Sequence, residues 1–210
     1  MAVIFAVVGS KESGKTTTIE YLTGKLAKEG FKVGTIKHIH DPTFSIDTPG
    51  KDTFRFAQAG AKIIVAATSR EITIIKKSEQ SSESFHLPEI LNLINKENLD
   101  VIFLEGFHST TAKRRDIQKI ITAKNEADLK KTLRGTIPPI LATTGLVATQ
   151  TSKSQIFNLP LVNISTNGES LVESIKKTIR NAANPQKNCK NPKKQRRNCR
   201  NVNEQDNHKK

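Results

Sequence analysis

The types and spacing of residues 9–16, Gly-Ser-Lys-Glu-Ser-Gly-Lys-Thr, are those of a phosphate-binding loop, G-x-x-x-x-G-K-T. Glycines let such a loop wrap closely, so that its backbone N–H groups point at phosphate oxygens. The loop therefore predicts a nucleoside triphosphate site, and the alternative is a structural glycine turn. The residues expected to hold the phosphates are Gly9, Ser10, Lys11, Glu12, Ser13, Gly14, Lys15, Thr16 and Thr17.

The flanks of the loop have the pattern that a phosphate-binding loop requires. An apolar run over residues 3–8 precedes it and predicts a strand, whereas Ile19, Leu22 and Leu26 follow at helical spacing and stop at Gly30. The start of that helix adds positive potential for phosphate. Within this arrangement we expect Lys15 to reach the β- and γ-phosphates and the Thr16 hydroxyl to bind Mg²⁺.

A second acid is needed beside the metal, at the end of a neighbouring strand. Glu105 is one candidate, because it ends the apolar run Val-Ile-Phe-Leu at residues 101–104 and would lie at the carboxyl edge of a parallel sheet. We expect it to contact Mg²⁺ through water or to orient the attacking water. The alternative is an ordinary loop or helix-capping carboxylate.

Asp47 is the other candidate acid. The sequence Asp47-Thr48-Pro49-Gly50 resembles the D-x-x-G switch of GTPases, whose Asp contacts Mg²⁺ through water. A polar stretch precedes it here, where the switch would follow a buried strand. The alternative is therefore a Pro-Gly turn.

A few further residues could touch substrate or phosphate. They are His38 and His40, which alternate onto one side of a strand end, Lys51-Asp52 after the Pro-Gly turn, and His108. Solvated positions on loops are the alternative for all of them. The segment 95–98, Asn-Lys-Glu-Asn, lacks the Asp of a guanine-reading N-K-x-D motif, so the base is left open.

Apolar runs alternate with helical patterns along the chain. This alternation predicts an α/β fold of three layers, a P-loop NTPase fold with a mostly parallel central sheet. The expected strands are residues 3–8, 31–37, 62–68, 72–76, 101–104, 116–123, 138–143 and 161–164. The expected helices, besides the one after the phosphate loop, are residues 52–59, 87–98, 127–133 and 170–180, and residues 78–84 form a polar loop.

Charge and composition divide the chain at residue 184. Of the net charge of +14, half lies in residues 184–210, which hold nine Lys or Arg against Glu204 and Asp206 and show no apolar periodicity. We expect residues 1–183 to form the nucleotide-binding domain and residues 184–210 to form a disordered basic tail. Cys189 and Cys199, the only cysteines, make a poor zinc site without partners. No signal peptide and no run of about 20 apolar residues is present, so a reduced, cytoplasmic protein without membrane contact is expected.

Several motifs occur in a specific order. They are residues 9–17 (GSKESGKTT), 36–38 (IKH), 47–52 (DTPGKD), 54–61 (FRFAQAGA) and 104–107 (LEGF). In this order they resemble the molybdopterin-guanine dinucleotide biosynthesis adapter proteins, the MobB family, over residues 2 to about 165.

The resemblance implies a GTP-binding protein with weak GTPase activity, commonly a homodimer, that assists the guanylyltransferase joining GMP to molybdopterin. Its cofactors would be GTP and Mg²⁺, and its partners the molybdopterin guanylyltransferase and molybdopterin itself. Residues 9–17 would hold the phosphates, Glu105 would be the strand-end acid, and Asp47 would lie near the metal. The family's His-rich segment after I-K-H is interrupted here by Pro42-Thr43-Phe44.

Two rival functions fit the same loop. One is a small-molecule kinase that holds its acceptor with Lys37, His38 or His40. The other is an NTPase recruited to nucleic acid by the basic tail, although the tail has no aromatic residue to stack on bases. Slow hydrolysis is expected, because Arg55 and Arg70 are only weak candidates for an arginine that stabilises the transferring phosphate.

Overall fold

The computed structural model describes residues 2–77 and 86–184. The expected polar loop at 78–84, both cysteines and the tail after residue 184 lie outside these ranges, so the division of the chain at residue 184 stays a prediction. The described residues form two compact units, one built from the chain up to Lys37 and from Asn98 onward, the other from His38–Glu97. None of the described helices is long and apolar enough to cross a membrane.

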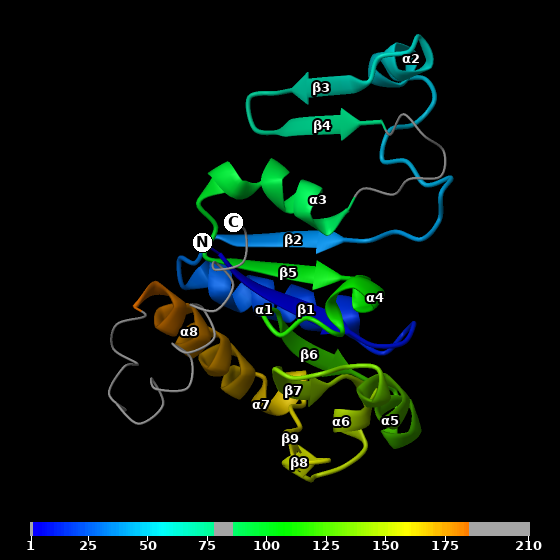
Figure 1. The fold of residues 1–210 in the computed structure, drawn as a ribbon. Coiled ribbons are helices and arrows are strands. Elements are labelled where there is room, and N and C mark those ends of the chain that lie inside the picture. Colours follow the sequence, from blue (N-terminus) through cyan, green and yellow to red (C-terminus); the bar gives the residue numbers. More distant parts are fainter. Residues whose placement is uncertain (1, 78–85, 185–210) are drawn as a thin grey trace, which may run out of the picture. The chain divides into compact units, whose positions relative to one another are not determined.

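The first unit is built on a sheet of five parallel strands (Figure 1). In chain order the strands are β1 (Val3–Val8), β2 (Val33–Lys37), β5 (Val101–Glu105), β6 (Gln118–Thr122) and β7 (Ile140–Thr144). Their order across the sheet is β2-β5-β1-β6-β7, and every pairing is parallel. The expected α/β fold with a parallel central sheet is thus confirmed.

Strand β1 lies at the centre of this sheet, between β5 and β6. Val7 of β1 pairs with Glu105 of β5, and Glu105 pairs in turn with Lys37 of β2. The carboxyl ends of the three strands therefore reach the same edge of the sheet. In open parallel sheets, ligands bind at this edge, where the strand order reverses.

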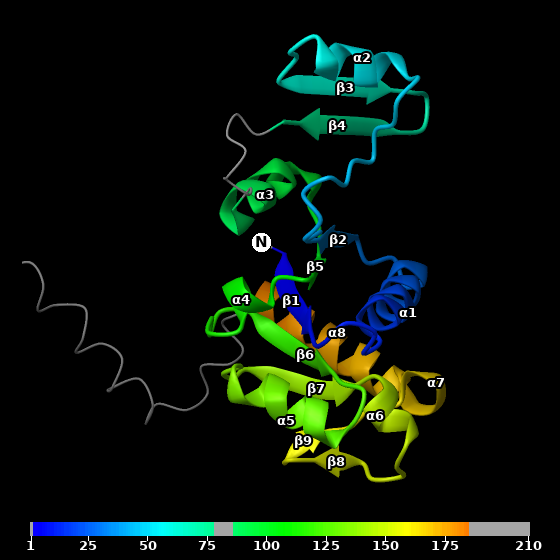
Figure 2. The same cartoon turned by 90° about the vertical axis from the view of Figure 1, so that its right-hand side faces the viewer.

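Two long helices, α1 (Lys15–Lys28) and α8 (Glu169–Ala183), cover one face of the sheet. Figure 2 shows them on one side of the strands, with α4 (His108–Thr111) and α5 (Glu126–Arg134) on the other. The helical spacing of α1 explains its place, because Ile19, Leu22 and Leu26 are all buried. They join a core with Phe5 and Phe103 of the sheet, whose rings lie 5.9 Å apart.

Residues 161–164 do not form the strand that the sequence predicts. Only Leu161 bridges to Thr143 of β7, because the Asn163 side chain accepts a hydrogen bond from the Ser165 N–H and starts a helix instead. The remaining short elements of this unit are α6 (Leu146–Thr149), β8 (Gln155–Ile156), β9 (Leu159–Pro160) and α7 (Ile164–Asn167).

The second unit holds an antiparallel hairpin and short helices. Strands β3 (Ile63–Ala67) and β4 (Ile72–Lys76) pair as expected, with the turn near residues 69–70. Helix α2 (Asp52–Gln58) contacts β3. The helix expected over 87–98 ends early, as α3 (Leu87–Leu93), and a 3-10 turn (Asn95–Glu97) follows it.

The two faces of the hairpin differ in exposure. Ile64 is buried, whereas the neighbouring positions on the opposite face hold four exposed apolar side chains. These are Ile63, Val65, Ile72 and Ile74, which are 57–69% exposed. Four β-branched side chains on one exposed face form an apolar surface that a soluble monomer seldom keeps.

Candidate functional site

The phosphate loop connects β1 to α1 through backbone that favours glycine. Gly14 has a φ of +97° and Glu12 a φ of +61°, both in the left-handed region. A side chain at residue 14 would be strained in this conformation, which explains the second glycine of the motif. The loop ends directly at Lys15, the first residue of α1.

The loop packs tightly against the ends of β6 and β7. A Cβ atom at Gly9 would lie 2.2 Å from the Thr122 carbonyl oxygen, and one at Gly145 would lie 2.2 Å from that of Ser13. The hydroxyl groups of Ser13 and Thr122 also share a buried hydrogen bond of 2.7 Å. Backbone approaches this close leave no room for side chains, so they hold the loop in one conformation.

A carboxylate of α5 ties the loop to the segment after β6. The Ser10 hydroxyl donates to Oδ2 of Asp128 at 2.7 Å, and the Lys124 N–H donates to the same oxygen at 2.9 Å. Helix α5 is positioned for this contact by Asn125, whose side chain accepts from the Asp128 N–H at 3.0 Å.

Lys15 folds back over the loop. Its Nζ donates to the carbonyl oxygens of Gly9 at 3.2 Å and Ser10 at 2.5 Å. Partial burial lowers the pKa of Lys15, and the negative charge of Glu105 opposes that shift. The ammonium thus lies where a phosphate on the loop would meet it.

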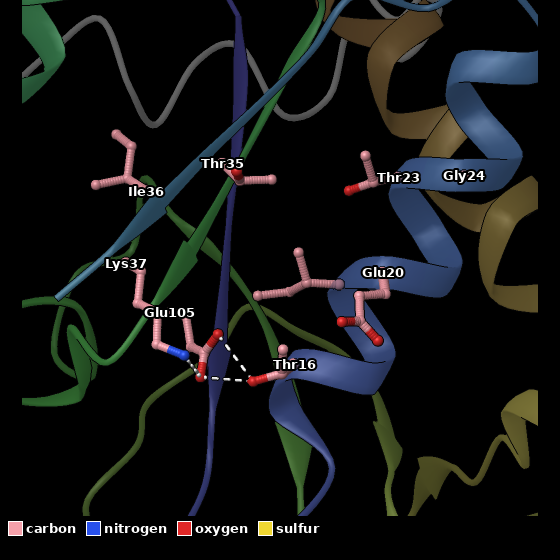
Figure 3. A pocket seen from close by; sticks show the side chains of 9 residues that line it. Thr16, Glu20, Thr23, Gly24, Thr35, Ile36, Lys37 and Glu105 are labelled. Carbon is pink, nitrogen blue, oxygen red and sulfur yellow. Dashed lines mark hydrogen bonds and ion pairs between the residues drawn. The ribbon is translucent and has the colours of Figure 1, made fainter. Parts of the chain in front are cut away.

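The structure brings together two of the predicted metal residues (Figure 3). The Thr16 hydroxyl donates to both oxygens of the Glu105 carboxylate, at 3.0 and 3.2 Å. Lys37 of β2 approaches the same carboxylate, with its Nζ 3.5 Å from Oε1. A hydroxyl and a carboxylate oxygen at one point are hard donors of the kind that Mg²⁺ prefers, so these residues fit the ion.

A pocket of about 460 Å³ lies over the loop. It is lined by Lys11, Glu12, Gly14, Lys15, Thr16, Thr17, Glu105 and Leu146. Most of the residues expected at the phosphates thus share one hollow with the strand-end acid. The side chains of Ser10 and Ser13 instead form hydrogen bonds that hold the loop, Ser10 to Asp128 and Ser13 to the Ser10 carbonyl oxygen.

Asp47, His38 and His40 belong to the second unit. Asp47 is 6% exposed, and its Oδ1 accepts hydrogen bonds from the Thr53 hydroxyl at 2.9 Å and the Thr48 N–H at 3.1 Å. Its Oδ2 has no hydrogen-bond partner among the described residues. The rings of His38 and His40 contact each other edge to face, with centroids 4.4 Å apart. The roles of these residues at the metal or substrate stay predictions.

His108 serves a structural contact in the first unit. Its Nε2 lies 2.9 Å from the hydroxyl of Thr136, which donates its own hydrogen to the Thr132 carbonyl oxygen. The ring N–H is therefore the donor to Thr136, and burial lowers the pKa of His108. This bond joins the start of α4 to the end of α5.

Sequence reasoning missed the residues that support the loop from behind. Asp128, Thr122 and Gly145 lie more than 100 positions away in the sequence, and none belongs to a phosphate-binding motif. One signal was available in the sequence: Gly145 directly follows the strand-like run Ile-Leu-Ala-Thr-Thr at residues 140–144. A glycine at a strand end marks a close approach of the backbone.

Comparison with known proteins decides the family. The family model described as "Molybdopterin guanine dinucleotide synthesis protein B" (MobB) matches residues 4–142, about two thirds of the chain. The chain belongs to the MobB family. The match includes the phosphate loop, Asp47 and Glu105.

MobB relatives and solved MobB structures agree with this assignment. The chain is 28% identical over 127 residues to the molybdopterin-guanine dinucleotide biosynthesis adapter protein of Escherichia coli, covering 60% of this chain and 69% of that one. It is 34% identical over 123 residues to a Methanocaldococcus jannaschii protein provisionally given the same name, covering 59% of this chain but only 48% of that relative's length.

Among solved structures, Bacillus subtilis MobB matches with a TM-score of 0.64 at 22% identity, covering 83% of this chain and 96% of that one. The MobB homologue of Bacillus stearothermophilus matches with a TM-score of 0.59 at 20% identity, covering 84% and 97%. These structures share the fold.

Replacing Asp128 by Ala should weaken binding of a nucleoside triphosphate to the loop about tenfold, because hydrogen bonds to a charged group contribute about 1.5–3 kcal/mol. Glu126→Ala, which removes an exposed carboxylate from the same helical turn, is the matched control. Isothermal titration calorimetry measures both. Equal affinities in the two variants would show that Asp128 does not position the loop.

Proposed function

We propose that this MobB chain binds GTP and Mg²⁺ in the cytoplasm and assists the guanylyltransferase that attaches GMP to molybdopterin, in molybdenum or tungsten cofactor maturation. One observation carries the proposal: a phosphate loop with Lys15 over it and Thr16 against Glu105, in a member of this family. The protein would act as an adapter whose nucleotide site serves binding first and hydrolysis second.

The loop supplies the binding energy for the triphosphate. In this proposal the backbone N–H groups of the loop and the start of α1 bind the phosphate oxygens. Lys15 exchanges its carbonyl contacts at Gly9 and Ser10 for the more strongly attracting phosphate charge. We propose GTP rather than ATP as the ligand because of the family resemblance. Parallel titrations with the two nucleotides test this preference.

Mg²⁺ would be held by Thr16 and Glu105. When bound, the ion neutralises charge on the β- and γ-phosphates. Glu105 is only slightly exposed, and the Lys37 ammonium lies 3.5 Å from its carboxylate. Asp47 is proposed as a further acid for the metal on the family resemblance alone.

Slow hydrolysis is part of this proposal. No arginine lines the phosphate pocket in the part of the chain that the structure describes. Arg55 instead pairs with Asp52 at 3.2 Å on the exposed surface of α2. A cation placed at the transferring phosphate can contribute about 10³-fold or more to the rate, so a site without one turns over slowly.

The proposed homodimer has a candidate surface in the second unit. Helix α2 contacts β3, and the face of the hairpin that carries the four exposed side chains is an apolar surface of the kind found at interfaces. The face of Ile63, Val65, Ile72 and Ile74 would be covered by the same face of a second chain, since an interface of two-fold symmetry is self-complementary.

Lys15→Ala should abolish measurable GTP binding in calorimetry, because it removes the cation that meets the β- and γ-phosphates. Lys28→Ala, an exposed lysine at the end of the same helix, and His86→Ala should bind GTP like the unaltered chain. Unchanged affinity in the Lys15 variant would defeat the assignment of the site.

Glu105→Gln should make GTP binding insensitive to Mg²⁺. In the unaltered chain, chelation of Mg²⁺ with EDTA should lower GTP affinity by about tenfold or more, because the metal no longer neutralises the phosphates. In the Glu105 variant the affinities with and without EDTA should converge. A variant that keeps the full response to Mg²⁺ would remove Glu105 from the metal site.

Paired substitutions Val65→Lys and Ile74→Lys, whose residues are cross-strand partners, should yield a monomer. Light scattering should give twice the chain mass of 23.2 kDa for the unaltered protein and for the control Leu93→Lys, an exposed leucine outside the hairpin. A monomeric unaltered protein would contradict the dimer.

A further inference from the structure

Lys37 lies on the far side of Glu105 from the phosphate loop. Strand β5, which ends at Glu105, pairs with β1 on one side and with β2 on the other, and the register sets Glu105 beside Val7 and Lys37. Figure 3 shows the carboxylate between the Lys37 ammonium and the Thr16 hydroxyl. Lys37 Nζ is 3.5 Å from Oε1, and the same oxygen accepts the Thr16 hydroxyl at 3.0 Å. A cation of the chain therefore contacts an oxygen of the proposed metal site.

Lys37 stands apart from the cations that would meet the phosphates. The residues lining the pocket over the loop include Lys11 and Lys15, whereas Lys37 lines a neighbouring hollow between α1 and β2, together with Thr16 and Glu105. The pocket and the hollow have the acid in common, and Lys37 approaches it from the side of β2. An effect of Lys37 on a metal would therefore act through the Glu105 carboxylate.

The charge of Lys37 extends to the loop. Burial lowers the pKa of Lys15, the negative charge of Glu105 opposes this shift, and the positive charge of Lys37 adds to it. Glu105 thus attracts a cation at the loop, and Lys37 repels it. A divalent cation bound at Glu105 would experience the same two charges.

The orientation of the Glu105 carboxylate does not depend on Lys37. The Thr16 hydroxyl donates to both carboxylate oxygens, and the Glu105 side chain is only 12% exposed, so packing and this donor already hold it. The Lys37 side chain is 57% exposed, and exposed ion pairs contribute little to stability. Removing the ammonium should therefore change the charge beside the acid and leave the acid in place.

Competition for one carboxylate oxygen gives the effect its sign. A metal ion at Oε1 either shares that oxygen with the ammonium or displaces the ammonium, and a like charge within about 6 Å disfavours the bound cation. Solvent around the exposed lysine screens this repulsion, so we expect an effect of about fivefold in affinity and not one of several orders of magnitude.

We propose that Lys37 weakens the binding of Mg²⁺ at Glu105 and so sets how strongly nucleotide affinity depends on the metal. The identity of the metal and of the nucleotide rests on the proposed function; the competition rests on the contacts of Glu105 alone. Lys37 acts through Glu105 and contacts neither the metal nor the nucleotide. The chain thus holds Mg²⁺ less tightly than the same acid would without a lysine beside it.

The affinity for GTP in Mg²⁺, divided by the affinity in EDTA, measures the effect. By linkage, this ratio is the factor by which GTP on the chain holds Mg²⁺ more tightly than free GTP does. Lys37→Met removes the ammonium but keeps an unbranched side chain, and it should raise the ratio about fivefold in calorimetry. Damage to the site would lower the ratio instead, so a ratio that falls or stays the same would overturn the proposal.

Two variants separate charge at this place from charge in general. Lys32→Met removes an exposed lysine just before the start of β2, at the other end of the strand, and should leave the ratio unchanged. Lys37→Arg keeps the positive charge and should keep the ratio of the unaltered chain. A rise in either variant that equals the rise in Lys37→Met would contradict the competition at Glu105.

A double substitution tests whether Lys37 acts through the acid. In a Glu105→Gln chain GTP binding should no longer respond to Mg²⁺, and the addition of Lys37→Met should not restore the response. A ratio that rises in the double variant would show that Lys37 acts on the metal or the nucleotide directly, against the proposal.

The two proposals fail separately. GTP binding with an unchanged ratio in Lys37→Met overturns the role of Lys37 and leaves the proposed function standing. A chain that binds neither GTP nor ATP would sink the proposed function, and titration of the chain with Mn²⁺ alone then decides on Lys37, with the free ion followed by electron paramagnetic resonance. Tighter Mn²⁺ binding in Lys37→Met than in the unaltered chain supports the competition, and equal or weaker binding overturns it.

Discussion

The close approach of the phosphate loop to the ends of β6 and β7 is the constraint on which the site depends. Gly9 and Gly145 allow backbone contacts that any side chain would prevent. The hydrogen bond between Ser13 and Thr122 joins the loop to β6 at the same place. These contacts hold one side of the loop against the ends of β6 and β7. The other side lines the pocket, where a phosphate could bind. The parallel order of the sheet then brings Glu105 to the same edge, where it meets Thr16.

Local pattern predicted those parts of the structure that local physics determines. The G-x-x-x-x-G-K-T loop, the helix through Ile19 and Leu22, and the buried strand before Glu105 all follow from spacing and apolar runs. The place of Glu105 at the sheet edge beside the loop followed too, because parallel strands end at one edge. In contrast, the strand expected at 161–164 failed, since Asn163 caps a helix and local capping outweighed a short apolar run.

Contacts between distant segments could not be predicted in this way. Asp128 accepts a hydrogen bond from Ser10, 118 positions away in the sequence, and no sequence periodicity indicates such a contact. For Asp47 the sequence offered a metal role, which stays a prediction; the structure shows a buried carboxylate that accepts hydrogen bonds from Thr48 and Thr53.

The contacts of Lys15 have a consequence for how tightly any nucleotide is held. Its ammonium is bonded to two carbonyl oxygens of the loop, and the Thr16 hydroxyl is bonded to Glu105. A phosphate at the loop would have to replace these partners, so that only the difference between the old and the new bonds would contribute to affinity. These existing contacts of Lys15 and Thr16 therefore limit the net gain in free energy from any phosphate that binds the loop.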